Sequence, residues 1–278
     1  MEVTRELNIE IERHYASSGL GDRLLRALAL AGKDVENLSP LDLAPMDEFH
    51  IRGRQATMEL ASAAGLTAGM EVLDVGCGIG GPSRCLAAEF GCRVTGVDLS
   101  AEYCAAATLL AERVGLAGRV SYCHGDALDL PFGEGSFDLV WSQHASMNIP
   151  DKKRLYGEMY RVLRPGGCVA LYDVLAGPGG EVIFPVPWAR TARTSFLANP
   201  AELEEVLLAS GFTIESWLDD TERATEWFAR LAGRIADNGL PPLGIHLLLG
   251  EDFPTMAGNQ RRNLEDVRIL LARVVARR

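Results

Sequence analysis

Three aspartates lie at or just after the ends of three successive apolar segments, where their carboxylates can hold the polar groups of one ligand. Asp74 lies near the end of EVLDVG, Asp98 near the end of RVTGVDLS, and Asp126 follows RVSYCHG. Carboxylates accept hydrogen bonds from ammonium, hydroxyl and amino groups. We therefore expect Asp74 to face an ammonium group and Asp98 to accept ribose hydroxyls. Asp126, followed by the small Ala127, is expected to accept from an exocyclic adenine amine.

The segment VLDVGCGIGG runs from an expected strand into an expected helix. Gly76, Gly78 and Gly80 leave room for a ligand to approach the backbone closely. Gly76, Gly78 and Gly81 also satisfy the pattern G-x-G-x-x-G, so a dinucleotide-binding oxidoreductase is an alternative. Asp74 argues against that alternative, because a carboxylate beside the loop would repel a pyrophosphate.

The elements that must position these residues follow a regular alternation from residue 70 onward. Short apolar segments alternate with helical ones, which predicts parallel β-α-β units and a doubly wound α/β sheet. The apolar segments lack polar alternation, as expected for strands covered on both faces. The predicted strands span 71–76, 93–100, 119–127, 137–143 and 168–174, and a helical segment over 152–167 precedes the last of them.

The segments before residue 67 and after residue 175 do not continue this alternation of strands and helices. Residues 1–66 are predicted to be helical, and 176–200, with four Pro and three Gly, is predicted to be a loop or lid. A helix ending at Gly211, the strand FTIESWLDD and an amphipathic helix over 222–237 follow. The final segment VRILLARVVARR fits helical spacing, but its β-branched residues also allow a strand.

Composition excludes several classes of protein. The net charge of −11 argues against nucleic acid and anionic membranes as partners. No uncharged apolar run approaches the ~18 residues of a membrane span, and the first residues lack a signal sequence, so we expect a cytoplasmic protein. The six cysteines contain no C-x-x-C pair, which predicts free thiols, and no metal-ligand spacing is present.

Taken together, these segments resemble the class I S-adenosylmethionine-dependent methyltransferases over about residues 70–175. The matching motifs are D-x-G-x-G-x-G at 74–80, the acid in GVDLS, GDA followed by LPF, FDLVWS and RVLRPGG. The resemblance implies S-adenosylmethionine as the cofactor and a Rossmann-like, mainly parallel seven-stranded sheet whose last strand, 267–276, is antiparallel. It implies these cofactor contacts: residues 76–80, Cys77 included, under the methionine part, Asp98 on the ribose, Leu99 on the adenine, Asp126 and Ala127 on the adenine edge, and Gln143 beside the sulfonium.

A second resemblance narrows the family. The segment LAPMDEFHIRGRQAT is similar to the one preceding the core in sarcosine/dimethylglycine, tocopherol and natural-product sugar methyltransferases. It implies that a helix carrying His50 and Gly53 packs on the cofactor, and that Tyr15 covers the site. His50 as a packing histidine and Tyr15 as a capping aromatic remain alternatives.

The stretch WSQHASMNIPDK departs from amine-methylating relatives, which carry an acid after the Gln and a His near the end. Here these positions hold His144 and Asn148. A neutral imidazole can take a proton from a hydroxyl or an acidic carbon, so we expect an O- or C-acceptor with His144 as the base. A pocket-lining role for His144 is the alternative. In the lid, Arg190 and Arg193, near Trp188, either hold an anionic or aromatic acceptor or lie at the surface.

We therefore expect one domain of four parts: a helical cover (1–66), a cofactor-binding core (67–175), an acceptor lid (176–200) and a C-terminal closure (201–278). Its expected activity is methyl transfer to a small molecule, by a monomer or homodimer. The alternatives are a natural-product cyclase that binds the cofactor without transferring methyl, a dinucleotide oxidoreductase and a non-catalytic partner-binding protein. The sequence leaves the acceptor and the methylated atom open.

Overall fold

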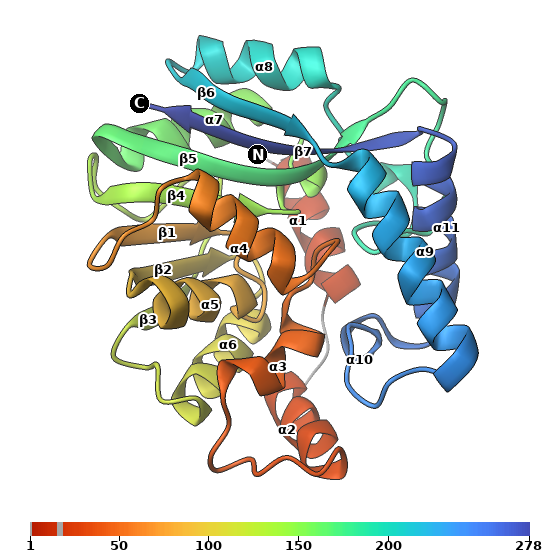
Figure 1. Ribbon diagram of the computed structural model, residues 1–278. Coiled ribbons are helices and arrows are strands. Elements are labelled where there is room, and N and C mark those ends of the chain that lie inside the picture. Colours follow the sequence, from red (N-terminus) through yellow and green to blue (C-terminus); the bar gives the residue numbers. More distant parts are fainter. Residues whose placement is uncertain (1, 16–18) are drawn as a thin grey trace.

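A seven-stranded sheet forms the centre of the molecule, and helices cover both of its faces (Figure 1). The computed structural model describes residues 2–15 and 19–278. The strand order is β3-β2-β1-β4-β5-β7-β6, and β7 runs antiparallel to both of its neighbours. This confirms the predicted doubly wound sheet with an antiparallel last strand. The strands are β1 (Glu71–Val75), β2 (Arg93–Asp98), β3 (Val120–His124), β4 (Phe137–Gln143), β5 (Leu163–Ala176), β6 (Thr213–Asp219) and β7 (Ile269–Arg277).

Helices precede the sheet, connect its strands and fill the segment between β6 and β7. The α-helices are α1 (Glu2–Tyr15), α2 (Leu20–Leu30), α3 (Pro40–Asp47), α4 (Arg54–Ala63), α5 (Gly81–Phe90), α6 (Ala101–Arg113), α7 (Lys152–Val162), α8 (Pro200–Ala209), α9 (Thr221–Asn238), α10 (His246–Leu249) and α11 (Phe253–Glu265). Three short 3-10 helices are η1 (Ser146–Asn148), η2 (Ala192–Thr194) and η3 (Gly250–Asp252). The predicted N-terminal helices are therefore present, apart from residues 1 and 16–18, which lie outside the described residues.

The fifth strand begins at Leu163 rather than at Cys168 as predicted. The helical prediction over 152–167 was wrong at its end, because Pro165 has no amide hydrogen and restricts the residue before it to extended backbone. Leu163 also pairs with Phe137 on β4, so the chain enters the sheet as soon as α7 ends.

The ambiguous last segment is a strand, and its misleading pattern comes from burial on both faces. Leu271 and Val275 pack in the apolar cluster on one side of β7, whereas Val274 and Ala276 pack in the cluster on the other side. A strand covered on both faces shows no alternation of polar and apolar residues. Helical spacing therefore carried no information here.

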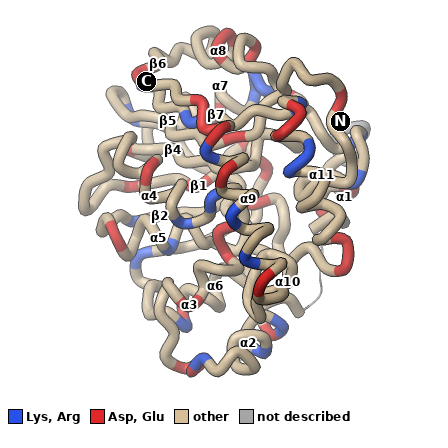
Figure 2. The backbone as a smooth tube through the Cα atoms, turned by 45° about the vertical axis from the view of Figure 1, so that its right-hand side comes forward, with Lys and Arg blue, Asp and Glu red and all other residues tan. Residues whose placement is uncertain are grey.

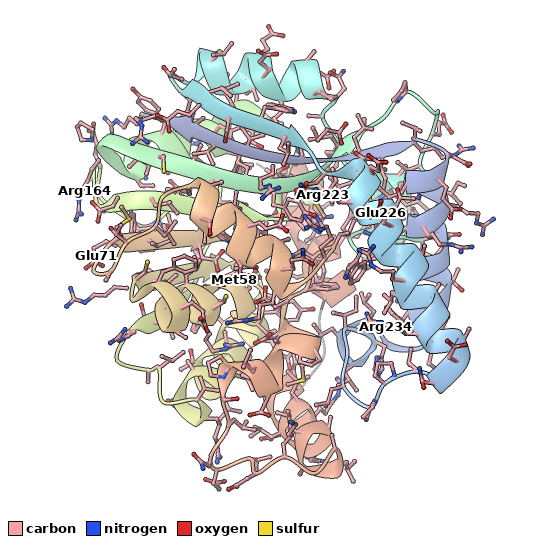
Figure 3. The ribbon with its side chains drawn as sticks, viewed as in Figure 1. Met58, Glu71, Arg164, Arg223, Glu226 and Arg234 are labelled. Carbon is pink, nitrogen blue, oxygen red and sulfur yellow. The ribbon has the colours of Figure 1, made fainter. Side chains whose placement is uncertain are left out.

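The chain between β6 and β7 leaves the sheet to form α9, α10 and α11, with α9 and α11 side by side at one end of the sheet (Figure 1). A buried ionic cluster anchors this segment. Asp220, which is 0% exposed, lies 3.3 Å from Arg52 Nη1 and 3.1 Å from Arg273 Nε. Arg223, labelled on α9 in Figure 3, lies with Nη1 3.3 Å from Glu59 Oε2 of α4.

Charged residues of both signs are interspersed over the outer elements, including α9 (Figure 2). None of the helices in the described ranges combines the length and apolar character that a membrane-spanning helix needs. The six cysteines are free thiols, as predicted, and all but Cys123 are buried.

Candidate active site

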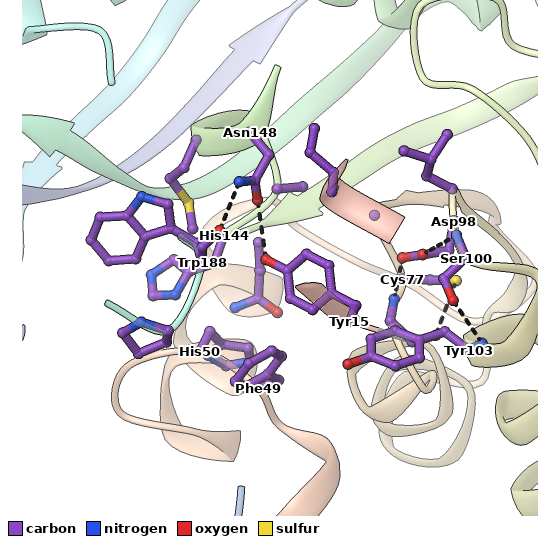
Figure 4. Close-up of a pocket in the computed structure, with 18 of the residues that line it drawn as sticks. Tyr15, Phe49, His50, Cys77, Asp98, Ser100, Tyr103, His144, Asn148 and Trp188 are labelled. Atoms are coloured by element: carbon purple, nitrogen blue, oxygen red, sulfur yellow. Dashed lines mark hydrogen bonds between the residues drawn. The ribbon is translucent and has the colours of Figure 1, made fainter. Parts of the chain in front are cut away.

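One large pocket opens at the carboxyl ends of β1, β2 and β4 (Figure 4). The strand order reverses between β1 and β4, and such switch points are where open α/β sheets bind ligands. The remaining wall comes from α1, the α3–α4 connection, the lid and the α9–α11 segment. Eleven of the predicted site residues line this pocket: Tyr15, His50, Gly76, Cys77, Gly78, Asp98, Leu99, Asp126, Ala127, Gln143 and His144.

The glycine loop brings the backbone against both the ligand space and the neighbouring loop. Gly76 has φ 76°, and a β-carbon there would lie 2.4 Å from Cβ of Ala145, so only glycine allows the loop after β4 to come this close. Gly78 has φ 54°, and a β-carbon there would meet nothing within 4 Å. The loop therefore leaves open space at its centre.

Asp98 ties this loop to the end of β2. Its carboxylate accepts hydrogen bonds from the amide of Gly78 at 2.8 Å and from the amide of Ser100 at 2.9 Å (Figure 4). Burial raises the pKa of Asp98, and the two backbone hydrogen bonds act in the opposite direction. Because a carboxylate has about four lone-pair positions, it can accept further bonds from a ligand.

Both carboxylate oxygens of Asp126 have partners within the chain. Its Oδ1 accepts from the amide of Leu128 at 2.9 Å, which is an Asx turn, while Oδ2 accepts from Asn8 Nδ2 of α1 at 3.2 Å. Leu99 and Ala127 line the same end of the pocket.

Three predicted residues lie behind the pocket wall rather than in it. Asp74 is 1% exposed and accepts a hydrogen bond from Ser83 Oγ at 2.5 Å, so the helix after the loop takes the carboxylate that was expected to face an ammonium group. Burial raises the pKa of Asp74 to about 7. A β-carbon on Gly80 would lie 2.3 Å from the hydroxyl of Tyr122, and Gly53 is the N-cap residue that precedes α4. Asp74 and Gly80 therefore shape the glycine loop, and Gly53 the start of α4, without lining the pocket.

The other end of the pocket contains two buried nitrogens without partners. Gln143 Oε1 accepts from Trp141 Nε1 at 3.0 Å and lies 3.2 Å from Thr57 Oγ1, which leaves Nε2 unpaired among the described residues. Nε2 of His144 is likewise buried and has no hydrogen-bond partner in the described ranges. Burial lowers the pKa of His144 well below its usual 6.5, and nearby His50 acts in the same direction.

Sequence reasoning missed the residue that holds His50. Glu48 is 4% exposed and lies with Oε2 2.9 Å from His50 Nε2 and 2.8 Å from Thr57 Oγ1. Thr57 in turn reaches Gln143, so a chain of polar contacts joins the α3–α4 connection to the end of β4. The sequence shows a Glu two residues before the His, but nothing in it indicates that both side chains are buried and in contact.

Asn148 joins the pocket end to α1 and to the lid. The hydroxyl of Tyr15 donates to its Oδ1 at 3.1 Å, and its Nδ2 donates to the carbonyls of Trp188 at 2.8 Å and Thr194 at 2.7 Å. Figure 4 shows Tyr15 between the Asp98 end and the His144 end. Burial raises the pKa of the Tyr15 phenol, which stays protonated as a donor.

The lid arginines lie at the surface. Arg190 pairs with Asp252, and Arg193 Nη2 lies 2.7 Å from Glu10 Oε2, with both guanidinium groups more than half exposed. Of the two predicted lid roles, the surface one is therefore correct. Trp188, in contrast, is 2% exposed and lines the pocket.

The far wall of the pocket was not predicted. The α9–α11 segment contributes seven lining residues, mostly apolar: Trp227, Phe228, Leu231, Ile245, Phe253, Ala257 and Gln260. Phe228 and Trp227 pack in the same apolar cluster as Trp188 of the lid, whereas Ile245, Phe253 and Ala257 pack with Phe49. In the sequence, the apolar spacing of 222–237 could not be distinguished from that of an ordinary core helix.

Comparison with known proteins agrees with this geometry. Residues 73–171 match the family described as Methyltransferase domain. The chain is 42% identical over 114 residues to a sterol 24-C-methyltransferase of Eremothecium gossypii, covering 41% of this chain and 31% of that protein. It is 46% identical over 101 residues to the chloroplastic tocopherol O-methyltransferase of Arabidopsis thaliana, covering 36% of this chain and 28% of that protein. The matched region thus spans about a third of the length of these curated relatives.

A solved structure matches over nearly the whole chain. The crystal structure of the cyclase SpnF covers 92% of this chain and 93% of its own, with a TM-score of 0.66 and 25% sequence identity. The likeness therefore extends well beyond the residues that match the family.

Proposed function

We propose that this chain, whose residues 73–171 form a methyltransferase domain, transfers a methyl group from S-adenosylmethionine to a small-molecule acceptor. One observation carries the proposal: a single pocket joins a glycine loop tied to Asp98 with a far end where Gln143 and His144 have unpaired buried nitrogens. When bound, the cofactor supplies a methyl carbon whose bond to sulfur breaks, with both electrons going to sulfur, as an electron pair of the acceptor forms the new bond.

The pocket fits this cofactor. Asp98 keeps lone pairs for two ribose hydroxyls, and the open space at Gly78 accommodates the methionine part. Leu99 would contact the adenine, and Asp126 and Ala127 would hold its edge, since all three line the pocket. Gln143 would hold the sulfonium end; Cys77 would form part of the loop wall, and Tyr15 and His50 would cover the cofactor.

An oxygen or carbon acceptor fits better than an amine. The position after Gln143, which would hold a cationic substrate if it were acidic, is His144, and burial keeps its pKa low and its ring neutral near pH 7. A neutral imidazole accepts the proton that a hydroxyl or an acidic carbon loses as it is methylated.

The test combines binding and turnover. We expect S-adenosylhomocysteine to bind in calorimetry, and methyl-labelled S-adenosylmethionine with a metabolite extract to yield a labelled small product. Absence of binding, or binding without label in any small molecule, would overturn the proposal.

A second function is favoured by the match to SpnF, which is described as a cyclase. In that case the chain would bind the cofactor and shape the substrate without transferring methyl. The two functions differ in stoichiometry: methyl transfer forms one S-adenosylhomocysteine per product, whereas cyclisation forms none. Chromatography of the cofactor after product formation separates them.

The remaining expectations stand as part of the proposal: one domain, a cytoplasmic location, and a monomer or homodimer. Light scattering of the purified chain measures the oligomeric state, and a fluorescent fusion in the native cell measures the location.

A further inference from the structure

The geometry points to an acceptor that is uncharged and largely apolar and that presents a single oxygen to Gln143 and His144. This inference rests on the proposed function and narrows its substrate class. It is carried by three independent features: the composition of the wall, the placement of the charges and the orientation of one amide.

The wall that the lid, α9 and α11 contribute to the pocket is aromatic and aliphatic. Trp188, Trp227, Phe228 and Phe253 line it together with Leu231, and they come from the lid, α9 and α11. Trp188 is 2% exposed, and Phe228 and Phe253 are each 7% exposed. A charged group placed against these side chains would lose its hydration without gaining a partner.

Most of the charged side chains that line the pocket have roles or partners away from this apolar wall. The described lining residues include no lysine or arginine, so none of them offers a cation to a phosphate or carboxylate. The lining carboxylates are Glu12, Asp47, Asp98 and Asp126. Asp98 and Asp126 lie at the cofactor end, and Asp47 lies 2.7 Å from Arg84 Nη2. Glu12 on α1 is the one acid left for a cationic acceptor, which makes it the control position.

The amide of Gln143 has a chemically fixed orientation. Trp141 Nε1 can only donate, so the atom 3.0 Å from it must be the Gln143 oxygen, and the amide nitrogen must point the other way. That nitrogen is buried and finds no acceptor among the described groups. A buried donor without a partner is costly, and an acceptor oxygen at this point satisfies it. Nε2 of the next residue, His144, is likewise buried and unpaired, and an oxygen of the acceptor is the partner that we assign to both.

The test uses the unaltered protein loaded with S-adenosylhomocysteine and three probes of matched size: hexylphenol, hexylbenzoate and hexylbenzylamine. Because Trp188 and Trp227 line the pocket, tryptophan fluorescence reports binding. We expect the neutral phenol to bind about tenfold tighter than either charged probe, since only these lose hydration without a partner. The inference is overturned if the benzoate binds more tightly than the phenol. It is also overturned if the amine binds more tightly than the phenol and Glu12→Gln abolishes this preference.

Two variants test whether the apolar wall causes the preference for the neutral probe. Leu231→Arg places a cation in it and is expected to weaken hexylphenol binding while strengthening hexylbenzoate binding. Leu208→Arg makes the same change on α8, where the side chain is 52% exposed, and should leave both affinities unchanged. Unchanged probe binding in Leu231→Arg would contradict the assignment of this wall. If Leu231→Arg fails to fold, the comparison of probes on the unaltered protein still decides.

The outcome is separable from that of the proposed function. Failure of S-adenosylhomocysteine to bind would overturn the methyltransferase proposal itself. Normal binding of S-adenosylhomocysteine with a preference for a charged probe would overturn only the substrate class.

Discussion

The imidazole ring of His144 stacks on the phenol ring of Tyr172, with ring centroids 5.3 Å apart and planes 12° from parallel. The amide of His144 also donates to the carbonyl of Tyr172 at 2.9 Å. This backbone bond allows His144 to hold a φ of 50°, a conformation that residues with a β-carbon seldom adopt. One neighbour on β5 therefore fixes both the backbone and the ring of His144, and strain of this kind is typical of functional positions.

Replacement of His144 by alanine tests its role as base. Loss of general-base catalysis lowers kcat by about 10²- to 10⁴-fold, while the affinity for S-adenosylhomocysteine stays unchanged. Initial rates and calorimetry measure the two quantities. The matched control is His246→Ala in α10, since His246 is not among the described residues that line the pocket. An unaltered kcat in His144→Ala would leave the ring as a pocket-lining group only.

The pH dependence of kcat follows from the same residue. Burial depresses the pKa of His144 below 6.5, so the ring stays unprotonated, and active as a base, as the pH falls through 6.5. We expect the acid limb of the kcat profile to lie below pH 6.5. A limb centred at or above that pH would show that another group, or a differently placed ring, takes the proton.

Asp98→Asn tests the cofactor end. Gly78 and Ser100 donate to different oxygens of Asp98, so the amide of Asn can accept from only one of them and has fewer lone pairs for a ligand. Loss of charge-assisted hydrogen bonds, each worth about 1.5–3 kcal/mol, should weaken S-adenosylhomocysteine binding by about 10- to 100-fold. Calorimetry measures the change. Asp129→Asn, at an 87% exposed side chain, is the control and should bind normally; equal affinities in the two variants would refute the assignment.

Asp74 predicts a pH dependence of stability. Its folded pKa of about 7 lies above the unfolded value of 3.8, so the folded state holds the proton more tightly. Its contribution to stability is complete below the unfolded pKa and is lost as the pH rises through about 7. While the group titrates, the free energy of unfolding falls by up to about 1.4 kcal/mol per pH unit. Asp74→Asn should remove this part of the slope in urea unfolding, whereas exposed Asp237→Asn should keep it; parallel curves for Asp74→Asn and the wild type would contradict the prediction.

The cofactor half could be predicted because its geometry is local. Asp98 and Gly78 end or follow adjacent strands, so the order of the elements alone brings them together. The acceptor half depends on contacts between distant segments. Nothing near Arg193 in the sequence shows that Glu10 draws it to the surface, and nothing near Trp227 distinguishes a pocket wall from a core. We expected Asp74 to face the ligand, but its carboxylate accepts a hydrogen bond from Ser83 in the first turn of α5.

The segment between β6 and β7 has a consequence for how the pocket can vary. Its two ends are adjacent, since Asp219 pairs with Ala272 in the antiparallel ladder, and it supplies much of the acceptor wall but none of the glycine loop. Under the proposed function, exchange of residues 221–268 would change the acceptor wall and leave the glycine loop unaltered, provided that buried Asp220, which pairs with Arg52 and Arg273, is kept. Exchange of this one segment is therefore a route to other acceptors.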